Sequence, residues 1–202
     1  MPPREGAFAQ YVAMQPDNLI EVPDDVSLDK AALAEPLAVS WHSARLGLEA
    51  LDPSASRRAL VLGGGAIGLA AALALQAMGV GDVTIAEPND TRRAFLQTRC
   101  GQEAVAAADG DYGLVIDAVG YAATRATASE CVEPGGVIIH IGLGEDLGGL
   151  DVRRMTLQEI TFIGTYTYTA RDFRDTAAAI FDVRLGPLDW IETRDLADGA
   201  DA

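Results

Sequence analysis

The stretch RALVLGGGAIGLAAALALQAMGVGDVTIAEP, residues 58–88, indicates the fold of this chain more strongly than any other. A short apolar run, 59–62, leads into a cluster of glycines, and an alanine-rich run, 66–78, follows it. A second apolar run lies at 83–86. Two short apolar runs separated by a helical segment are typical of parallel strands joined by a helix. The sequence therefore predicts a β-α-β unit whose helix begins at a glycine-rich turn.

The glycines in this turn have the spacing of a dinucleotide-binding fingerprint, Gly63-x-Gly65-x-x-Gly68. The first glycine permits a tight turn, the second allows a pyrophosphate to approach the backbone, and the third lets the helix lie close to the strand. The amides of Ala66 and Ile67 would attract the phosphate charge at the start of the helix. Alone, the spacing is also compatible with a tight turn between packed elements, because the chain holds 21 glycines.

An acidic residue strengthens the dinucleotide interpretation. Glu87 ends the second apolar run, nineteen residues after Gly68. A carboxylate there accepts hydrogen bonds from the adenosine ribose and repels a 2′-phosphate, so NAD is favoured over NADP. Arg92 and Arg93 follow closely and weaken this preference, because an arginine can accept the 2′-phosphate. The plainer alternative makes Glu87 a solvated turn residue.

The remainder of the chain continues the alternation of strands and helices. Further strands are predicted at 103–107, at 113–120 with an end near residue 118, at 135–143 and at 159–166. Helices are predicted at 91–100 with Asp90 as N-cap, at 122–131 and at 171–183. Six strands separated by helices predict an α/β fold with a doubly wound parallel sheet. Residues 6–23 read as short strands and turns, Ser27 as a helix cap, and Pro36 as an interruption of a helix that continues to residue 51.

Composition narrows the function classes. The 202 residues carry a net charge of −15, which disfavours nucleic acid as a partner, and 49% are hydrophobic, enough for a substantial core. No apolar run has the length of a membrane span, and the first residues do not resemble a signal peptide, so we expect a cytoplasmic protein without membrane contact. Two distant cysteines form no zinc motif. His42 and His140 are predicted to be hydrogen-bonded core residues, and Asp117 to cap a loop.

Several segments, taken in order, resemble the medium-chain zinc-dependent alcohol and polyol dehydrogenases, and most of all their sorbitol and threonine dehydrogenase branch. The matching segments are GAFAQYV, NLIEVPDDVSLDKAALAEPLAV, VLGGGAIGL, VTIAEPNDTRR, VIDAVG, CVEPGGVIIHIGL and LQEITFIGTY. They extend from residue 6 to about residue 191. The set is specific, although each segment alone is not.

The resemblance implies a six-stranded Rossmann sheet and a role for particular residues. Residues 63–68 would hold the pyrophosphate of NAD, and Glu87 the adenosine ribose, with Arg92 beside it. Ala118 and Val119 would line the adenine and nicotinamide side of the cleft, and Ile141, Gly142 and Leu143 would face the nicotinamide carboxamide. Glu35, in AEPLAV, matches a position that lies at the catalytic zinc in this branch, either as a ligand or by holding the zinc-bound water.

The chain also departs from the family. Family members have three features that this sequence does not show. These are a first segment with a zinc-binding Cys and a Gly-His-Glu motif, a structural-zinc cluster of four cysteines, and a helix at the position that lies between residues 107 and 113 of this chain. The departures imply a remnant of a GroES-like catalytic domain at 1–51, an NAD-binding domain at 52–185 and the start of a return segment at 186–202. No catalytic residue is assigned, and zinc and the alcohol or polyol substrate belong to the intact parent. A homodimer through the edge segment 159–166 is expected.

Two other functions remain open on the sequence. One is a zinc-independent reductase of quinones or enones that uses NADPH, which Glu87 and AEPLAV disfavour. The other is a module without enzymatic activity that binds NAD as a signal. The absence of a full set of zinc ligands suits this second alternative.

Overall fold

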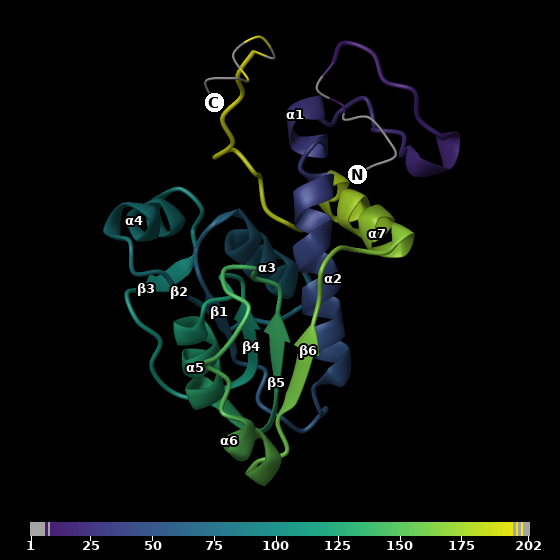
Figure 1. The fold of residues 1–202 in the computed structure, drawn as a ribbon. Coiled ribbons are helices and arrows are strands. Elements are labelled where there is room, and N and C mark those ends of the chain that lie inside the picture. The colour runs from purple at the N-terminus through teal and green to yellow at the C-terminus, as the bar shows by residue number, and fades with distance from the viewer. Residues whose placement is uncertain (1–6, 8, 196, 198, 200–202) are drawn as a thin grey trace.

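In the computed structural model, six parallel strands form one sheet in the order β3-β2-β1-β4-β5-β6 (Figure 1). The structure describes residues 7, 9–195, 197 and 199. This strand order is that of a doubly wound dinucleotide-binding sheet, which confirms the predicted fold class. The strands are β1 (Ala59–Leu62), β2 (Val83–Ala86), β3 (Glu103–Val105), β4 (Tyr112–Asp117), β5 (Val132–His140) and β6 (Thr161–Gly164).

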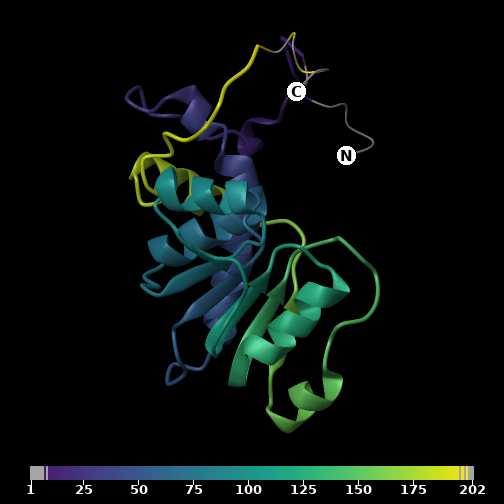
Figure 2. The same cartoon turned by 90° about the vertical axis from the view of Figure 1, so that its left-hand side faces the viewer.

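Helices cover both faces of the sheet. They are α1 (Leu28–Ala31), α2 (Ala34–Ala50), α3 (Ala66–Ala77), α4 (Asp90–Thr98), α5 (Ala122–Cys131), α6 (Val152–Leu157) and α7 (Ala170–Phe181). Helices α2 and α3 pack against the sheet and each other, and α7 packs on α2, whereas α5 lies against β4 and β5 on the opposite face (Figure 2). None of the described helices has the length and apolar character needed to span a bilayer.

The apolar strands explain the two-sided core. All four residues of β1 are buried, and all six residues of β4 are buried as well. Alternate residues point to opposite faces, so Val61 joins the core under α2 and α3, while Leu60 and Leu62 join the core under α5. A parallel sheet buried on both faces accounts for the continuous apolar runs in the sequence.

A buried ionic cluster joins α2 to α7. The carboxylate of Asp172 is fully buried, and it accepts hydrogen bonds from Arg45 Nε at 2.7 Å and from Thr169 in the capping box of α7. His42 Nδ1 lies 2.8 Å from the same carboxylate. Burial opposes ionisation of Asp172, but these partners outweigh it and hold the pKa of the carboxyl far below its usual range. The cluster fixes the angle at which α7 lies on the long helix that covers the sheet.

The crossover from β3 to β4 contains no helix. Residues 106–111 alone make this connection, as the sequence indicated. Of these residues, Ala106, Ala107 and Ala108 lie beside the sheet at its carboxyl end. The sheet face next to α5 is therefore covered over β1 and β2 by a short loop, which leaves room for the cleft described below.

Some local predictions are wrong. Among the described residues of 6–23 there is no strand, only a turn of 3-10 helix at Pro16–Asn18, and Tyr11 is 94% exposed. Residues 6 and 8 lie outside the described part. A strand needs a neighbouring strand to pair its backbone N–H and C=O groups, and the described part of this segment has no such neighbour.

Helix boundaries also differ from the predictions. The N-cap of α4 is Asn89, whose side chain accepts from the Arg92 amide, and Asp90 begins the helix. Pro36 does not interrupt α2 but lies in its first turn, where its missing N–H removes no helical hydrogen bond. The short helix α6 was not foreseen, although Asp151 caps it. Ser27 caps α1 as predicted.

Candidate functional site: a cleft at the carboxyl edge of the sheet

The main candidate site is a cleft of about 700 Å³ at the carboxyl ends of β1, β2 and β4. It lies where the strand order reverses between β1 and β4, the position at which doubly wound sheets bind ligands. Backbone and small side chains dominate its walls. Its lining includes Leu62, Gly63, Gly65, Ala86, Glu87, Pro88, Arg92, Ala106, Ala107, Ala108, Ala118, Val119, Tyr121, Thr124, Thr127, Glu130 and Cys131.

The three fingerprint glycines each meet a different steric requirement. Gly63 has a φ of +91°, and a Cβ there would lie 2.3 Å from Val119 Cγ2. A Cβ on Gly68 would lie 1.8 Å from the carbonyl oxygen of Gly63, so only glycine allows α3 to pack this close to the turn. A Cβ on Gly65 would meet no atom within 4 Å. The fold itself therefore requires Gly63 and Gly68, whereas Gly65 keeps open a space that a ligand can enter.

Helix α3 begins beside this open space, because its N-cap Gly65 lines the cleft, whereas Ala66, Ile67 and Gly68 are not among the lining residues. Gly65 is its N-cap and offers no side chain to the first amides, and Ala66 begins the helix. The amides of Ala66, Ile67 and Gly68 are in the first turn, so none has an acceptor within the helix. The buried body of the helix is anchored by small residues, and Ser40 of α2 donates to the Ile67 carbonyl at 2.8 Å. Such an amino terminus is suited to a phosphate group.

Glu87 lies at the end of β2 with only 2% of its surface exposed. Its Oε2 accepts from the Gly64 amide at 2.9 Å and from Arg92 Nη1 at 3.2 Å, and its Oε1 accepts from the Asn89 amide at 2.8 Å. Burial opposes ionisation, but the two amides and Arg92 outweigh it and lower the pKa of this carboxyl. A fixed negative charge thus borders the cleft, in contrast to the alternative of a solvated turn residue.

The loops after β4 and β5 form the other side of the site. Asp117, 1% exposed at the end of β4, accepts from the amides of Val119 and Gly120 at 3.0 and 2.9 Å, which confirms the predicted loop-capping role. The Gly142 amide in turn donates to the Asp117 carbonyl at 3.1 Å, and a Cβ on Gly142 would lie 2.1 Å from the Val119 carbonyl carbon. The two loops therefore pack backbone against backbone.

The predicted residues of this half do not all line the cleft. Ala118 and Val119 do. Ile141 and Gly142 are buried behind them in the neighbouring loop, and Leu143 is 79% exposed at its surface. The structure brings these five residues into two adjoining loops, and only Ala118 and Val119 line the cleft.

A residue that the sequence reasoning missed lies beneath these loops. Arg125 of α5 is 6% exposed, and its guanidinium donates to the carbonyls of Gly120, Glu145, Leu147 and Gly148. An arginine in an alanine- and threonine-rich helix is easily taken for a solvated side chain. The signal that could have found it is the run of glycines after β5, which a long donor side chain can hold.

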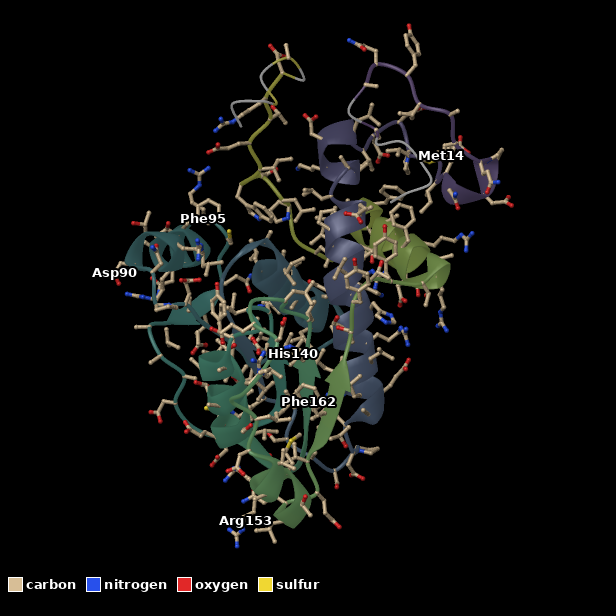
Figure 3. The ribbon with its side chains drawn as sticks, viewed as in Figure 1. Met14, Asp90, Phe95, His140, Arg153 and Phe162 are labelled. Atoms are coloured by element: carbon tan, nitrogen blue, oxygen red, sulfur yellow. The ribbon has the colours of Figure 1, made fainter. Side chains whose placement is uncertain are left out.

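Both histidines are hydrogen-bonded and largely buried, as predicted. His140 Nδ1 lies 3.1 Å from Asp117 Oδ2, and the His140 ring faces Phe162 of the neighbouring strand at a centroid distance of 5.6 Å (Figure 3). His42 belongs to the ionic cluster between α2 and α7. Neither ring lines the cleft.

Glu35, the predicted metal residue, lies apart from this cleft. It is exposed in the first turn of α2, and Tyr168 donates a hydrogen bond to its Oε1 at 3.1 Å. Burial and the charge of Glu35 raise the pKa of Tyr168. The two side chains line a second cavity of about 440 Å³ together with Met14, which Figure 3 places on the N-terminal segment above α7.

The residues around Glu35 do not form a zinc site by themselves. Within the described ranges, no three His, Cys, Asp or Glu side chains come together as a metal would require. A catalytic zinc takes three protein ligands and an open position. The donors in the described part of the chain therefore do not fit a resident zinc, and Glu35 could supply at most one ligand of a larger set.

The sequence of the chain matches a family of known proteins over much of its length. The sequence model of a family described as zinc-binding dehydrogenase matches residues 66–182. A relative from Saccharomyces cerevisiae, the probable diacetyl reductase [(R)-acetoin forming] 2, is 31% identical over 199 residues, covering 90% of this chain and 47% of the relative. The chain spans about half the length of the curated relatives it matches.

Solved structures share the fold. A zinc-binding dehydrogenase from Sinorhizobium meliloti, solved with NADP, aligns with a TM-score of 0.79 at 22% identity, covering 90% of this chain and 56% of that one. The short chain alcohol dehydrogenase of Escherichia coli CFT073, solved with NADH, aligns with a TM-score of 0.78 at 20% identity and the same coverage. One of these two proteins was thus solved with NADP and the other with NADH.

Proposed function

The chain belongs to the zinc-binding dehydrogenase family, and from this premise we propose that it is the NAD-binding part of an alcohol or polyol dehydrogenase. The family match covers α3 to α7 and includes most of the residues that line the cleft. The activity of a whole enzyme is part of the proposal, because the chain spans about half of its relatives. In such an enzyme the cofactor accepts a hydride from a secondary alcohol.

The observation that carries the proposal is the pairing of an open Gly65 with an ionised Glu87 at one cleft. The two lie on either side of the space before α3, where a pyrophosphate would meet the first-turn amides of Ala66, Ile67 and Gly68. The carboxylate of Glu87 would accept hydrogen bonds from the ribose hydroxyls. The adenosine half of a dinucleotide is thereby matched by groups that the fold already holds in place.

The same carboxylate supports NAD over NADP. Its Oε2 is engaged by Gly64 and Arg92, so a 2′-phosphate would face a buried negative charge whose arginine neighbour is already paired. Like charges brought together out of water cost free energy, which discriminates against the phosphorylated cofactor. Arg92 contributes by orienting Glu87.

The second half of the cofactor would lie against the loops after β4 and β5. Ala118 and Val119 line the cleft and would contact it directly. Ile141, Gly142 and Leu143 do not line the cleft, and they would face the carboxamide only from the neighbouring loop. Alcohol oxidation of this type uses a zinc ion to bind the alkoxide and lower its pKa. We propose that the ligands for that metal come mainly from a catalytic domain beyond this chain, with Glu35 facing it.

The domain division is likewise proposed as 1–51 for the remnant of a catalytic domain, 52–185 for the NAD-binding domain and 186–202 for a return segment. Part of the first and last ranges lies outside the described residues. We further propose a cytoplasmic homodimer joined through β6, since this strand ends the sheet and leaves one of its sides unpaired.

Two measurements on the purified chain test the proposal. Titration with NADH, followed by nicotinamide fluorescence, should show saturable binding, and a flat titration would contradict NAD binding. Addition of zinc, NAD and a panel of secondary alcohols and polyols should give no increase in NADH absorbance. Sustained turnover would contradict the assignment of the metal ligands to a domain beyond this chain.

A further inference from the structure

A single buried cation bonds to both the loop after β4 and the loop after β5. Arg125 projects from the first turns of α5 and is 6% exposed. Its Nη1 donates to the Gly120 carbonyl at 2.9 Å, and its Nε and Nη2 donate to Gly148 and Leu147 at 2.6 Å each. A further bond from Nη1 reaches the Glu145 carbonyl at 3.1 Å. One guanidinium therefore links the loop after β4 to the loop after β5.

All four acceptors are backbone carbonyls rather than carboxylates. A buried guanidinium is tolerated only where its charge and its donors are satisfied, and carbonyl dipoles converging from two loops provide this. The arrangement has a geometric consequence. The planar fork of Nε, Nη1 and Nη2 fixes the relative position of three peptide groups in one loop and a fourth in the other, which a point charge on a flexible stem would not do.

Backbone hydrogen bonds from the amides of Gly144 and Glu145 hold the first part of the loop after β5 to the loop after β4, and Arg125 holds the part that follows. Residues 141–151 include Gly142, Gly144, Gly148 and Gly149, and the last two have φ of +85°. Glycine loses more conformational freedom on ordering than any other residue. A further hydrogen bond restricts the conformation of this loop, because the Glu145 side chain accepts from the Ala122 amide at 2.7 Å. Arg125 links the far end of this loop, around Gly148, to Gly120 in the loop after β4.

The loop after β4 lines one half of the cleft, and the loop after β5 packs against it. In a doubly wound sheet, a dinucleotide extends across the reversal of strand order, with one nucleotide over each half. Gly65 and Glu87 belong to the half formed by β1, β2 and β3, and the loops after β4 and β5 belong to the other. Val119 and Tyr121 of the first loop face the cleft, and the second loop supports them from behind.

We propose that Arg125 is a positioning residue for the nicotinamide half of the cofactor, because it sets the two loops against which that half binds. It acts through Gly120 and residues 145–148 and does not itself contact the cofactor. The inference rests on the proposed NAD site and adds that separate groups of residues hold the two halves of the cofactor. Glu87 and the start of α3 hold the adenosine half independently of Arg125.

The experiment compares NAD with AMP, which contains only the adenosine half. Affinities for both are measured by isothermal titration calorimetry on the full chain, for wild type, Arg125→Met, Arg125→Lys and the control Arg171→Met. Arg171 is an exposed arginine on α7, with its side chain 79% accessible. Arg125→Met should weaken NAD about tenfold and leave AMP within about twofold of wild type, because only the second half of the site is disordered. Arg171→Met should change neither.

The lysine variant keeps the charge but not the fork, and protects the test if the methionine variant does not fold. We expect Arg125→Lys to keep AMP binding and to bind NAD more weakly than wild type. A parallel loss of NAD and AMP affinity, or wild-type affinity for NAD in the lysine variant, would overturn the inference. So would a wild-type chain that binds NAD no more tightly than AMP. A wild-type chain that binds neither nucleotide would instead overturn the proposed function.

Discussion

The buried carboxylate of Glu87 accepts a hydrogen bond of 2.9 Å from the amide of Gly64, in the turn before α3. The contact joins the end of β2 to the glycine-rich turn that follows β1. It places a negative charge beside the space left open by Gly65. One relationship thus couples the local fold to the chemistry that would recognise a dinucleotide.

Removing the charge of Glu87 should relax the cofactor preference. In Glu87→Gln, the amide keeps one acceptor oxygen but no longer repels a 2′-phosphate, so the ratio of NAD to NADP affinity should fall by about tenfold. The amide nitrogen would also face donors from Gly64, Asn89 and Arg92, so the melting temperature should fall. Competitive titration of both cofactors measures the ratio.

The matched control is Glu103→Gln, which changes an exposed carboxylate on β3. It should leave the ratio unchanged. A Glu87→Gln variant that discriminates between the cofactors as strongly as wild type would show that the charge is not the source of the preference.

Substitutions at two of the fingerprint glycines should have different effects, one on NAD binding and the other on folding stability. In Gly65→Ala, the new methyl group would meet no protein atom within 4 Å, and the φ of −71° suits alanine. Its thermal stability should therefore match that of wild type while its NAD affinity falls about tenfold or more, because the methyl group occupies the space of the pyrophosphate.

Gly68→Ala should behave in the opposite way. Its Cβ would lie 1.8 Å from the Gly63 carbonyl oxygen, so the variant should lose about 3 kcal/mol or more of unfolding free energy. Chemical denaturation measures this loss. A stable Gly68→Ala, or a Gly65→Ala that binds NAD normally, would argue against these assignments.

The ionic cluster at Asp172 should make stability depend on acid pH. Its pKa is lower in the folded chain than the value of about 3.9 expected on unfolding, so the ionised group stabilises the fold above that value. This contribution is lost as pH falls through the lower folded pKa. Asp172→Asn should be about 2 to 3 kcal/mol less stable than wild type at pH 7, because Arg45 loses its buried partner.

Denaturant titrations at several pH values follow this difference. The gap between wild type and Asp172→Asn should narrow steadily below about pH 4. Asp175→Asn, on the exposed side of α7, should show no comparable gap at pH 7. A gap of constant size down to pH 2 would mean that the stabilisation does not come from the ionised carboxylate.

Much of the fold could be read from the sequence because its signals are local. The apolar runs at 59–62 and 83–86 became β1 and β2 without a shift, and 122–131 became α5. The glycine spacing and Glu87 likewise predicted residues that meet at the cleft, because each of these features directly follows an apolar run that became a strand.

The remainder depends on contacts between distant segments. Residues 9–23 have strand-like composition but no neighbouring strand, which no local pattern reveals. Arg125 bonds to carbonyls more than twenty positions away along the chain, and its burial follows from how a glycine-rich loop folds over α5. Asn89 rather than Asp90 capped α4 because both residues are good caps and the end of β2 sets where the helix begins.

The central claim is that this chain holds an NAD site selected by Glu87. It is tested most directly by calorimetric titration of the wild-type chain with NAD and with NADP under identical salt and pH. The account predicts binding of one NAD per chain, at least about tenfold tighter than NADP. Equal or tighter binding of NADP, or no binding of either cofactor, would contradict it.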